Sequence, residues 1–253
     1  MPRPGSRTND ELRPLTFELG FTRQAAGSVL VRSGRTAVLC TCCVEPKVPE
    51  FLEGKGQGWL TAEYGMLPGS TGSRKPRDKA GKVDGRSVEI QRLIGRSLRA
   101  AVDLAKLGER TLWIDCDVLE ADGGTRTAAI NGAFVAVALA LANTAGKTGL
   151  KPGDVLIDSV AAISVGLCDG EARLDLEYDE DRDAEVDFNV VMTGRGAFVE
   201  VQGSGEEATF SRQQLDNLLE LATGGIRTIA GLQKAALGEC WPIVLRSTTP
   251  LLA

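Results

Sequence analysis

Six consecutive residues, Asp122-Gly123-Gly124-Thr125-Arg126-Thr127, carry the strongest chemical signal in the sequence. They lie between a run typical of a strand (111–119) and a run typical of a buried helix (127–145). Glycines let a backbone approach an anion closely, the first N–H groups of a helix point at it, and an arginine fork matches phosphate oxygens. We therefore predict an oxyanion site at Gly124, Thr125 and Arg126. A glycine turn in which Thr125 only caps the helix is the alternative.

The charges of the chain are strongly segregated, although the net charge is only -5. Residues 69–99 contain nine cations and three anions, and Arg86 stands there just before a helical pattern, where it can add a second cation to the same anion. Residues 175–187 contain eight acids and Arg182. A solvated loop explains either run by itself. Together they suit a cationic groove for a polyanion beside an acidic cluster that holds a divalent cation.

Within the acidic run, the spacing of apolar residues distinguishes one aspartate. Val186, Phe188 and Val190 alternate with Asp187 and Asn189, so a strand here turns Asp187 away from the apolar row. Asp181 lies six residues earlier and reaches Asp187 only if the segment between them bends. We expect Asp179 and Asp183 to belong to the solvated remainder.

The chain has no histidine, which excludes Ser-His-Asp, Cys-His and His-metal mechanisms. The six cysteines show no CxxC spacing, and we expect buried reduced thiols rather than zinc ligands or disulfides. The tripeptide Gly146-Lys147-Thr148 lacks the earlier glycine of a nucleotide-binding loop and follows a helix, so it is not expected to bind nucleotide.

The elements that must position these residues form two similar halves. Strand-turn-strand patterns occur at 29–39 and 186–201, with Gly34-Arg35 and Gly194-Arg195 in matching turns. A long helix follows in each half, over 87–107 before Gly108, and from Ser211, which begins a capping box with Gln214. Residues 45–85 lack periodicity and predict a long loop. The order of elements predicts the α+β class, with one domain over 1–253 built of two similar β-hairpin/helix halves.

Composition favours a folded, soluble protein. The 253 residues are 43% hydrophobic and 25% charged, which suffices for a full-sized core. The first residues lack an apolar signal region, and the longest apolar stretch, 133–142, is too short to span a bilayer. We expect a cytoplasmic protein with no membrane partner.

Several long motifs resemble the ribonuclease PH family, and the resemblance covers nearly the whole chain. The motifs occupy residues 58–68, 89–103, 115–119 with 121–127, and 186–194. The resemblance implies a ribonuclease PH-like fold and a phosphorolytic 3′→5′ exoribonuclease, or tRNA nucleotidyltransferase, that trims the 3′ ends of tRNA precursors. It also implies a homohexameric ring built as a trimer of dimers. The alternative is a non-catalytic ring subunit that only binds RNA, as in relatives of this fold in exosome rings.

The resemblance also implies roles for individual residues. Inorganic phosphate, the co-substrate, is expected at Arg86, Gly124, Thr125 and Arg126. Asp181 and Asp187 are expected to bind a divalent metal, Mg²⁺, or to assist proton transfer. Many members carry an arginine after the Met-Leu-Pro, where this chain has Gly69, so the RNA-contacting arginines of that loop are represented by Arg74 and Arg77.

One further RNA contact is predicted from helical spacing. Arg92, Arg96 and Arg99 fall at i, i+4 and i+7 and share a face away from the core. We expect Arg99 to contact the RNA backbone. For Arg92 and Arg96, pairing with the acids of a neighbouring subunit is an equal alternative.

Overall fold

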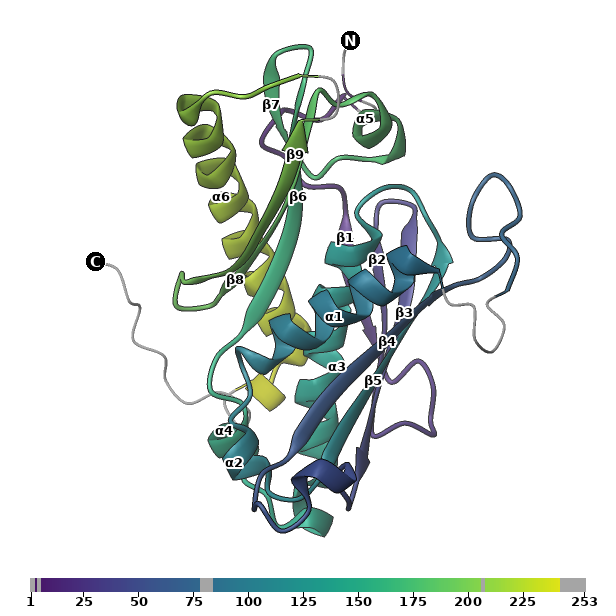
Figure 1. Cartoon of the computed structure of the whole chain (residues 1–253), viewed down its shortest axis with the longest axis vertical. Helices are drawn as coiled ribbons and strands as arrows, with labels where there is room; N and C mark the ends of the chain where they lie inside the picture. Colours follow the sequence, from purple (N-terminus) through teal and green to yellow (C-terminus); the bar gives the residue numbers. More distant parts are fainter. Residues whose placement is uncertain (1–2, 4–5, 78–83, 206–207, 242–253) are drawn as a thin grey trace.

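Two sheets with helices packed between and beside them make up the protein (Figure 1). The computed structural model describes residues 3, 6–77, 84–205 and 208–241. The five-stranded sheet has the order β1-β2-β3-β5-β4, with β1 (Leu15–Leu19), β2 (Gly27–Ser33), β3 (Thr36–Glu45), β5 (Thr111–Glu120) and β4 (Trp59–Met66). Its neighbouring strands are antiparallel except β4 and β5, which run parallel.

The second sheet has four antiparallel strands in the order β7-β6-β8-β9. They are β7 (Glu171–Leu174), β6 (Val160–Cys168), β8 (Val186–Thr193) and β9 (Phe198–Gly205). The two hairpins predicted as a repeat, β2–β3 and β8–β9, are both present, and the α+β class is confirmed.

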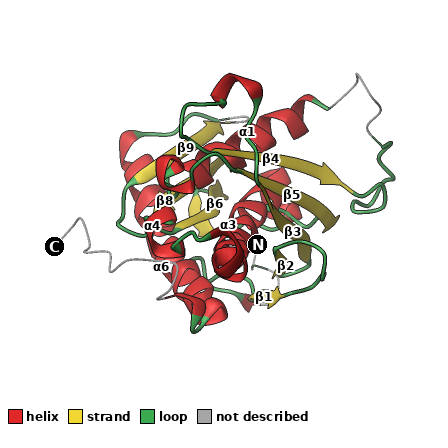
Figure 2. Ribbon diagram, turned by 90° about the horizontal axis from the view of Figure 1, so that it is seen from below, coloured by secondary structure: helices red, strands yellow, loops and turns green. Residues whose placement is uncertain are grey.

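Helix α3 (Thr125–Thr148) lies between the sheets and contacts β2, β3 and β5 of the first and β6 of the second (Figure 2). Its small residues permit this double packing, since a Cβ at Gly132 would come within 2.7 Å of Cys40 Sγ. The helix is long and apolar enough to cross a membrane, but 78% of its apolar window is buried inside the fold. It therefore behaves as a core helix.

Two further long helices pack on the sheets, and both also contact α3. α1 (Gly85–Arg99) packs on β4, and α6 (Arg212–Leu237) packs on β6, β7 and β8. The predicted capping box of Ser211 and Gln214 starts α6. Four short helices complete the described chain: η2 (Glu50–Leu52), α2 (Leu104–Leu107), α4 (Pro152–Val155) and α5 (Tyr178–Asp183).

Three sequence predictions about local structure were wrong. The predicted loop 45–85 contains β4, whose alternation of buried Leu60, Ala62 and Tyr64 is hidden by flanking glycines and charges. The helix predicted over 87–107 divides, because α1 ends at Arg99 and the side chain of Asp103 caps a separate α2. Cys43 is exposed, whereas Cys40, Cys42, Cys116 and Cys168 are buried free thiols as expected. The cations Lys79 and Lys82 of the basic run lie outside the described residues.

Candidate active site

An open cleft of about 940 Å³ brings together the charged residues predicted from the two halves. Its lining includes Arg86 from α1, Arg126 from α3, Asp181 from α5 and Asp187 from β8. β9 completes the wall with Gln202, Gly203 and Ser204. Two arginines and two aspartates that are separated by up to about a hundred residues in sequence therefore face a single cleft.

The predicted glycine loop leads into Arg126, which lines this cleft, whereas Gly124 and Thr125 are not part of the lining. Gly123 and Gly124 have φ angles of 72° and 63°, in the left-handed region that favours glycine. A Cβ at Gly123 would meet the carbonyl oxygen of Leu176 at 2.5 Å, so the loop packs tightly against the second half. The buried Thr36 hydroxyl donates to the Gly123 carbonyl at 2.7 Å and accepts from the Asp122 N–H at 2.9 Å. The loop is thus held from both halves.

Thr125 begins α3 and does not cap it. The N-cap is Gly124, and no side chain of the described residues caps this end, which leaves first-turn N–H groups for an outside acceptor. The Thr125 hydroxyl accepts a 2.9 Å hydrogen bond from the buried Tyr64 of β4. Burial raises the pKa of Tyr64, so its hydroxyl remains a donor. The structure therefore excludes the simple cap, and the oxyanion site stays a prediction.

The two arginines predicted for phosphate differ in how firmly they are held. Arg126 donates from Nη1 to Gln202 Oε1 at 2.6 Å and lies 3.5 Å from Glu89 Oε1. Arg86 is exposed in the first turn of α1, whose N-cap is Asp84. Both line the cleft. Guanidinium groups facing one cleft from two helices provide a cradle for a phosphate anion.

Asp181 and Asp187 are brought close enough to influence one another, because the six residues of α5 make the bend that the prediction required. Burial in the cleft, and then the charge of Asp187, raise the pKa of Asp181, while Arg86 and Arg126 oppose the shift. Ser204 Oγ donates to Asp187 Oδ1 at 3.3 Å. As predicted, Asp187 alternates with the buried residues of β8.

The two carboxylates suit a Mg²⁺ ion that keeps waters and substrate phosphates among its ligands better than a metal ion bound entirely by protein side chains. Among residues 3, 6–77, 84–205 and 208–241, no group of three or more His, Cys, Asp or Glu side chains gathers in metal-binding distance. Magnesium is commonly held by one or two carboxylates and completes its shell with waters and substrate phosphates. Asp181 and Asp187 can supply those two carboxylates.

The rest of the acidic run has two other environments. Arg182 pairs with Asp179 at 2.8 Å and with Asp183 at 2.7 Å, and these side chains are exposed, as expected for a solvated remainder. Arg182 and Asp183 nevertheless also line the cleft, which the sequence interpretation did not anticipate. Asp175 and Glu180 are buried, which the sequence interpretation did not anticipate. Their partners are arginines near the N-terminus and, for Glu180, also Arg173 of β7 at 3.5 Å.

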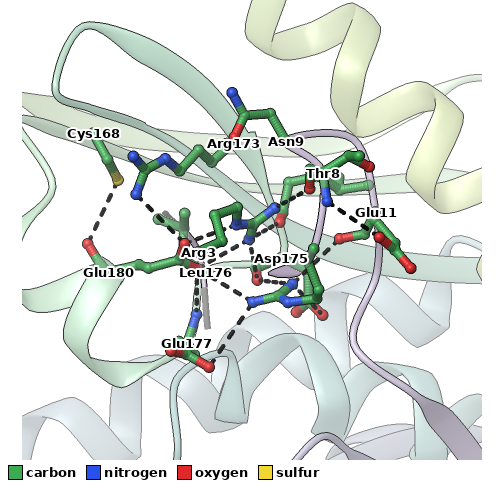
Figure 3. Close-up of polar contacts among 12 residues, drawn as sticks. Arg3, Thr8, Asn9, Glu11, Cys168, Arg173, Asp175, Leu176, Glu177 and Glu180 are labelled. Atoms are coloured by element: carbon green, nitrogen blue, oxygen red, sulfur yellow. Dashed lines mark hydrogen bonds and ion pairs between the residues drawn. The ribbon is translucent and has the colours of Figure 1, made fainter. Parts of the chain in front are cut away.

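Those arginines form a buried cluster around the acidic segment (Figure 3). Arg3 binds Glu180 through Nε at 2.8 Å and Nη2 at 3.0 Å, and it also donates to the Leu174 carbonyl at 2.7 Å. Arg7 lies 3.3 Å from Glu180. Because Glu180 belongs to α5, this cluster fixes the short helix that carries Asp181.

The residues predicted for RNA contact lie outside the cleft lining. Arg74 and Arg77 are exposed on residues 67–77, which follow β4 and project from the body of the molecule in Figure 1. Arg99 is half-buried, lies over the Trp59 ring at 5.5 Å and donates to the Leu60 carbonyl at 3.0 Å. Arg96 pairs within the chain with Glu200 of β9 at 2.5 Å. The structure therefore gives Arg96 and Arg99 intramolecular contacts.

Sequence reasoning missed several residues of the site. Asn189 could have been found, since it follows Asp187 by two in the same strand and lines the cleft. Gln202 and Ser204 lie opposite Asn189 and Asp187 in the β8–β9 register, so the predicted hairpin held an indirect signal. Thr36 and Tyr64 carried no local signal, because each meets residues 122–125 of the glycine loop only through the fold.

Comparison with known proteins gives family matches over most of the chain. Two family models match the chain: the 3′ exoribonuclease family, domain 1, over residues 11–143, and domain 2 of the same family over 158–225. Ribonuclease PH of Bacillus velezensis is 57% identical over 242 residues, which cover 95% of this chain and 98% of that protein. Ribonuclease PH of Corynebacterium efficiens is 57% identical over 237 residues, covering 93% and 96%.

Solved structures with the same fold are more distant in sequence. Rice (Oryza sativa) Rrp46 aligns with a TM-score of 0.74 at 17% identity, over 94% of this chain and 100% of that one. A chain of the Archaeoglobus fulgidus exosome with RNA bound to the active site aligns with a TM-score of 0.74 at 22% identity, over 90% and 91%. These similarities establish the shared architecture.

Proposed function

The chain belongs to the 3′ exoribonuclease family that includes ribonuclease PH, and we propose that its cleft is where it trims RNA with inorganic phosphate. The protein is a phosphorolytic 3′→5′ exoribonuclease that acts in tRNA processing. The observation that carries the assignment of the site is the convergence of Arg86, Arg126, Asp181 and Asp187 on one cleft.

The reaction requires two anions to meet in line. Arg86, Arg126 and the first N–H groups of α3 hold inorganic phosphate and offset its repulsion from the terminal phosphodiester. A phosphate oxygen attacks the phosphorus, the bond from phosphorus to the upstream 3′ oxygen breaks, and that oxygen takes up a proton. The products are a nucleoside 5′-diphosphate and an RNA shortened at its 3′ end.

We assign Asp181 and Asp187 the role of assisting the departure of the 3′ oxygen, either by holding a metal ion or by assisting proton transfer. When bound, Mg²⁺ would stabilise negative charge on that oxygen. Assistance to proton transfer at that oxygen is the alternative role of the two carboxylates. Ser204 orients Asp187 from the neighbouring strand.

The upstream part of the RNA is expected to contact arginines outside the cleft. Arg74 and Arg77, exposed on the segment that precedes α1, attract the upstream RNA backbone by charge, which requires no base sequence. Arg99 is assigned to the same path.

We propose that the protein is a homohexamer, a trimer of dimers, in the cytoplasm. Sedimentation at assay concentration tests the assembly, and an active monomer would contradict it.

Product analysis tests the reaction itself. A short RNA is incubated with and without phosphate, and the nucleotides released are separated by chromatography. We expect nucleoside diphosphates that appear only with phosphate. Monophosphates released at equal rate without phosphate would contradict phosphorolysis, and RNA binding without any release would identify a non-catalytic ring subunit.

A further inference from the structure

Glu89 is an acid placed beside the two arginines assigned to phosphate, and the mechanism above does not use it. It follows Arg86 by three residues on α1, so the two side chains are neighbours on the helix surface. Its Oε1 lies 3.5 Å from Nη1 of Arg126. A carboxylate therefore lies against the guanidinium that has to receive phosphate.

Gln202 fixes Arg126 independently of this carboxylate. Its Oε1 accepts the 2.6 Å hydrogen bond from Arg126, whereas its Nε2 donates to Glu89 Oε1 over 3.4 Å. Both contacts of Glu89 are longer than an ordinary N–H···O bond. The Glu89 side chain is 41% exposed and that of Arg126 only 16%. Glu89 is thus the loosely held member of the group.

The position of β9 against α1 does not depend on Glu89 either. Arg96, two turns further along α1, binds Glu200 of β9 through Nε at 2.5 Å and Nη2 at 2.8 Å. Glu200 stands two residues before Gln202 in the strand. This ion pair keeps Gln202 beside the cleft when Glu89 moves.

We propose that Glu89 is a displaceable counter-ion that sets the affinity of the phosphate site. It pairs with Arg126 when no phosphate is bound, and phosphate displaces it. Because two anions compete for one cation, the carboxylate weakens the binding of phosphate and also of the nucleoside diphosphate product, whose terminal phosphate occupies the same place. This inference rests on the phosphorolytic function proposed above.

The substitution Glu89→Gln tests the role, since it removes the charge and keeps the size of the side chain. We expect the KM for phosphate to fall about threefold, the scale of a partly exposed ion pair. Calorimetry with phosphate alone should show an equal gain in affinity, and inhibition by nucleoside diphosphate should strengthen. Glu89→Asp, which withdraws the carboxylate by a methylene, should fall between the parent and Glu89→Gln, and it serves as the test if Glu89→Gln fails to fold.

Two further variants separate this role from a structural one. Gln202→Ala removes the firm anchor of Arg126 and should raise the KM for phosphate. Glu53→Gln removes an equal charge from an exposed residue that is not part of the cleft lining, and the KM should stay unchanged. An unchanged or higher KM in Glu89→Gln, with phosphate affinity to match, would overturn the counter-ion role. A parent enzyme that needs no phosphate would instead overturn the proposed function.

Discussion

Arg13 and Asp175 form a buried ion pair between the segment before β1 and the segment after β7. Nη2 of Arg13 lies 2.7 Å from Oδ1 of Asp175 and Nε lies 3.0 Å from Oδ2, which also accepts the Arg13 backbone N–H at 2.8 Å. Nη1 donates to the carbonyl of Asp122. A single guanidinium thereby joins the glycine loop to the acidic segment that leads to α5.

We expect Asp175→Asn to destabilise the protein by about 3 kcal/mol, because removing one partner leaves a buried charge uncompensated. Asp175 has a φ of 54°, which asparagine also tolerates, so the backbone should be kept. Urea denaturation measures the change. The control is Asp216→Asn, in an exposed pair with Arg212 at 2.9 Å, where the loss should stay under about 0.5 kcal/mol. Equal losses in the two variants would contradict the prediction.

The ion pairs of Glu180 with Arg3 and Arg7 make the stability of the fold depend on pH. Burial by itself raises the pKa of Glu180, but the hydrogen bond and charge of Arg3, with the charge of Arg7, outweigh it and lower the pKa. A lowered pKa in the folded state contributes stability that is complete above the unfolded pKa and is lost as the pH falls through the folded pKa.

Glu180→Gln should therefore lower the free energy of unfolding at pH 7, and its difference from the parent should shrink as the pH falls below about 4. Urea midpoints measured over a series of pH values check this expectation. A difference that stayed constant with pH would mean that the Glu180 charge does not stabilise the fold.

Much of the fold could be predicted because its signals are local. The β2–β3 and β8–β9 hairpins follow from alternation and glycine turns, and α6 follows from the capping box at Ser211. β4 could not be identified, since its partner β5 joins it through a parallel pairing that crosses more than forty residues of chain. A parallel pair leaves no turn signal in the sequence.

The site was predictable where chemistry and spacing coincide. The Gly123-Gly124-Thr125-Arg126 loop identified Arg126 and the alternation in β8 identified Asp187, and both of these residues line the cleft. The arginine cluster was not predictable, because Arg3 and Glu180 are 177 positions apart and each looks like an ordinary surface charge in sequence. Only the fold shows that these charges are buried and that their ion pair holds α5 in place.

Tyr64 should contribute to phosphate binding through Thr125. Tyr64→Phe keeps the buried ring and removes the hydroxyl that donates to Thr125 Oγ1 at 2.9 Å. We expect the KM for phosphate to rise about fivefold, equivalent to about 1 kcal/mol for one hydrogen bond, with a smaller change in kcat. Steady-state kinetics at varied phosphate measure the split. A loss confined to kcat would place Tyr64 outside phosphate binding.

Arg126→Lys tests the planar fork directly. Lysine keeps the charge but cannot make two parallel bonds to phosphate oxygens while also holding Gln202. We expect catalytic efficiency for phosphate to fall about tenfold or more, on the order of 1.5–3 kcal/mol for a charge-assisted bond. If the lysine variant used phosphate as well as the parent, Arg126 would serve the structure and not the reaction.

Asparagine substitutions at four aspartates test which carboxylates take part in the reaction and which are only solvated charges. Asp181→Asn and Asp187→Asn should each cut turnover by at least about a hundredfold, the scale for losing a metal ligand or a proton-transfer group, while RNA binding without phosphate persists. Asp179→Asn and Asp183→Asn should stay within a few-fold of the parent, because both carboxylates are exposed and paired with Arg182. Turnover and RNA affinity, measured on all four variants with and without chelator, test whether only Asp181 and Asp187 take part in the reaction. Four equal effects, or activity indifferent to the chelator and to both inner substitutions, would reduce the whole acidic run to a charged surface.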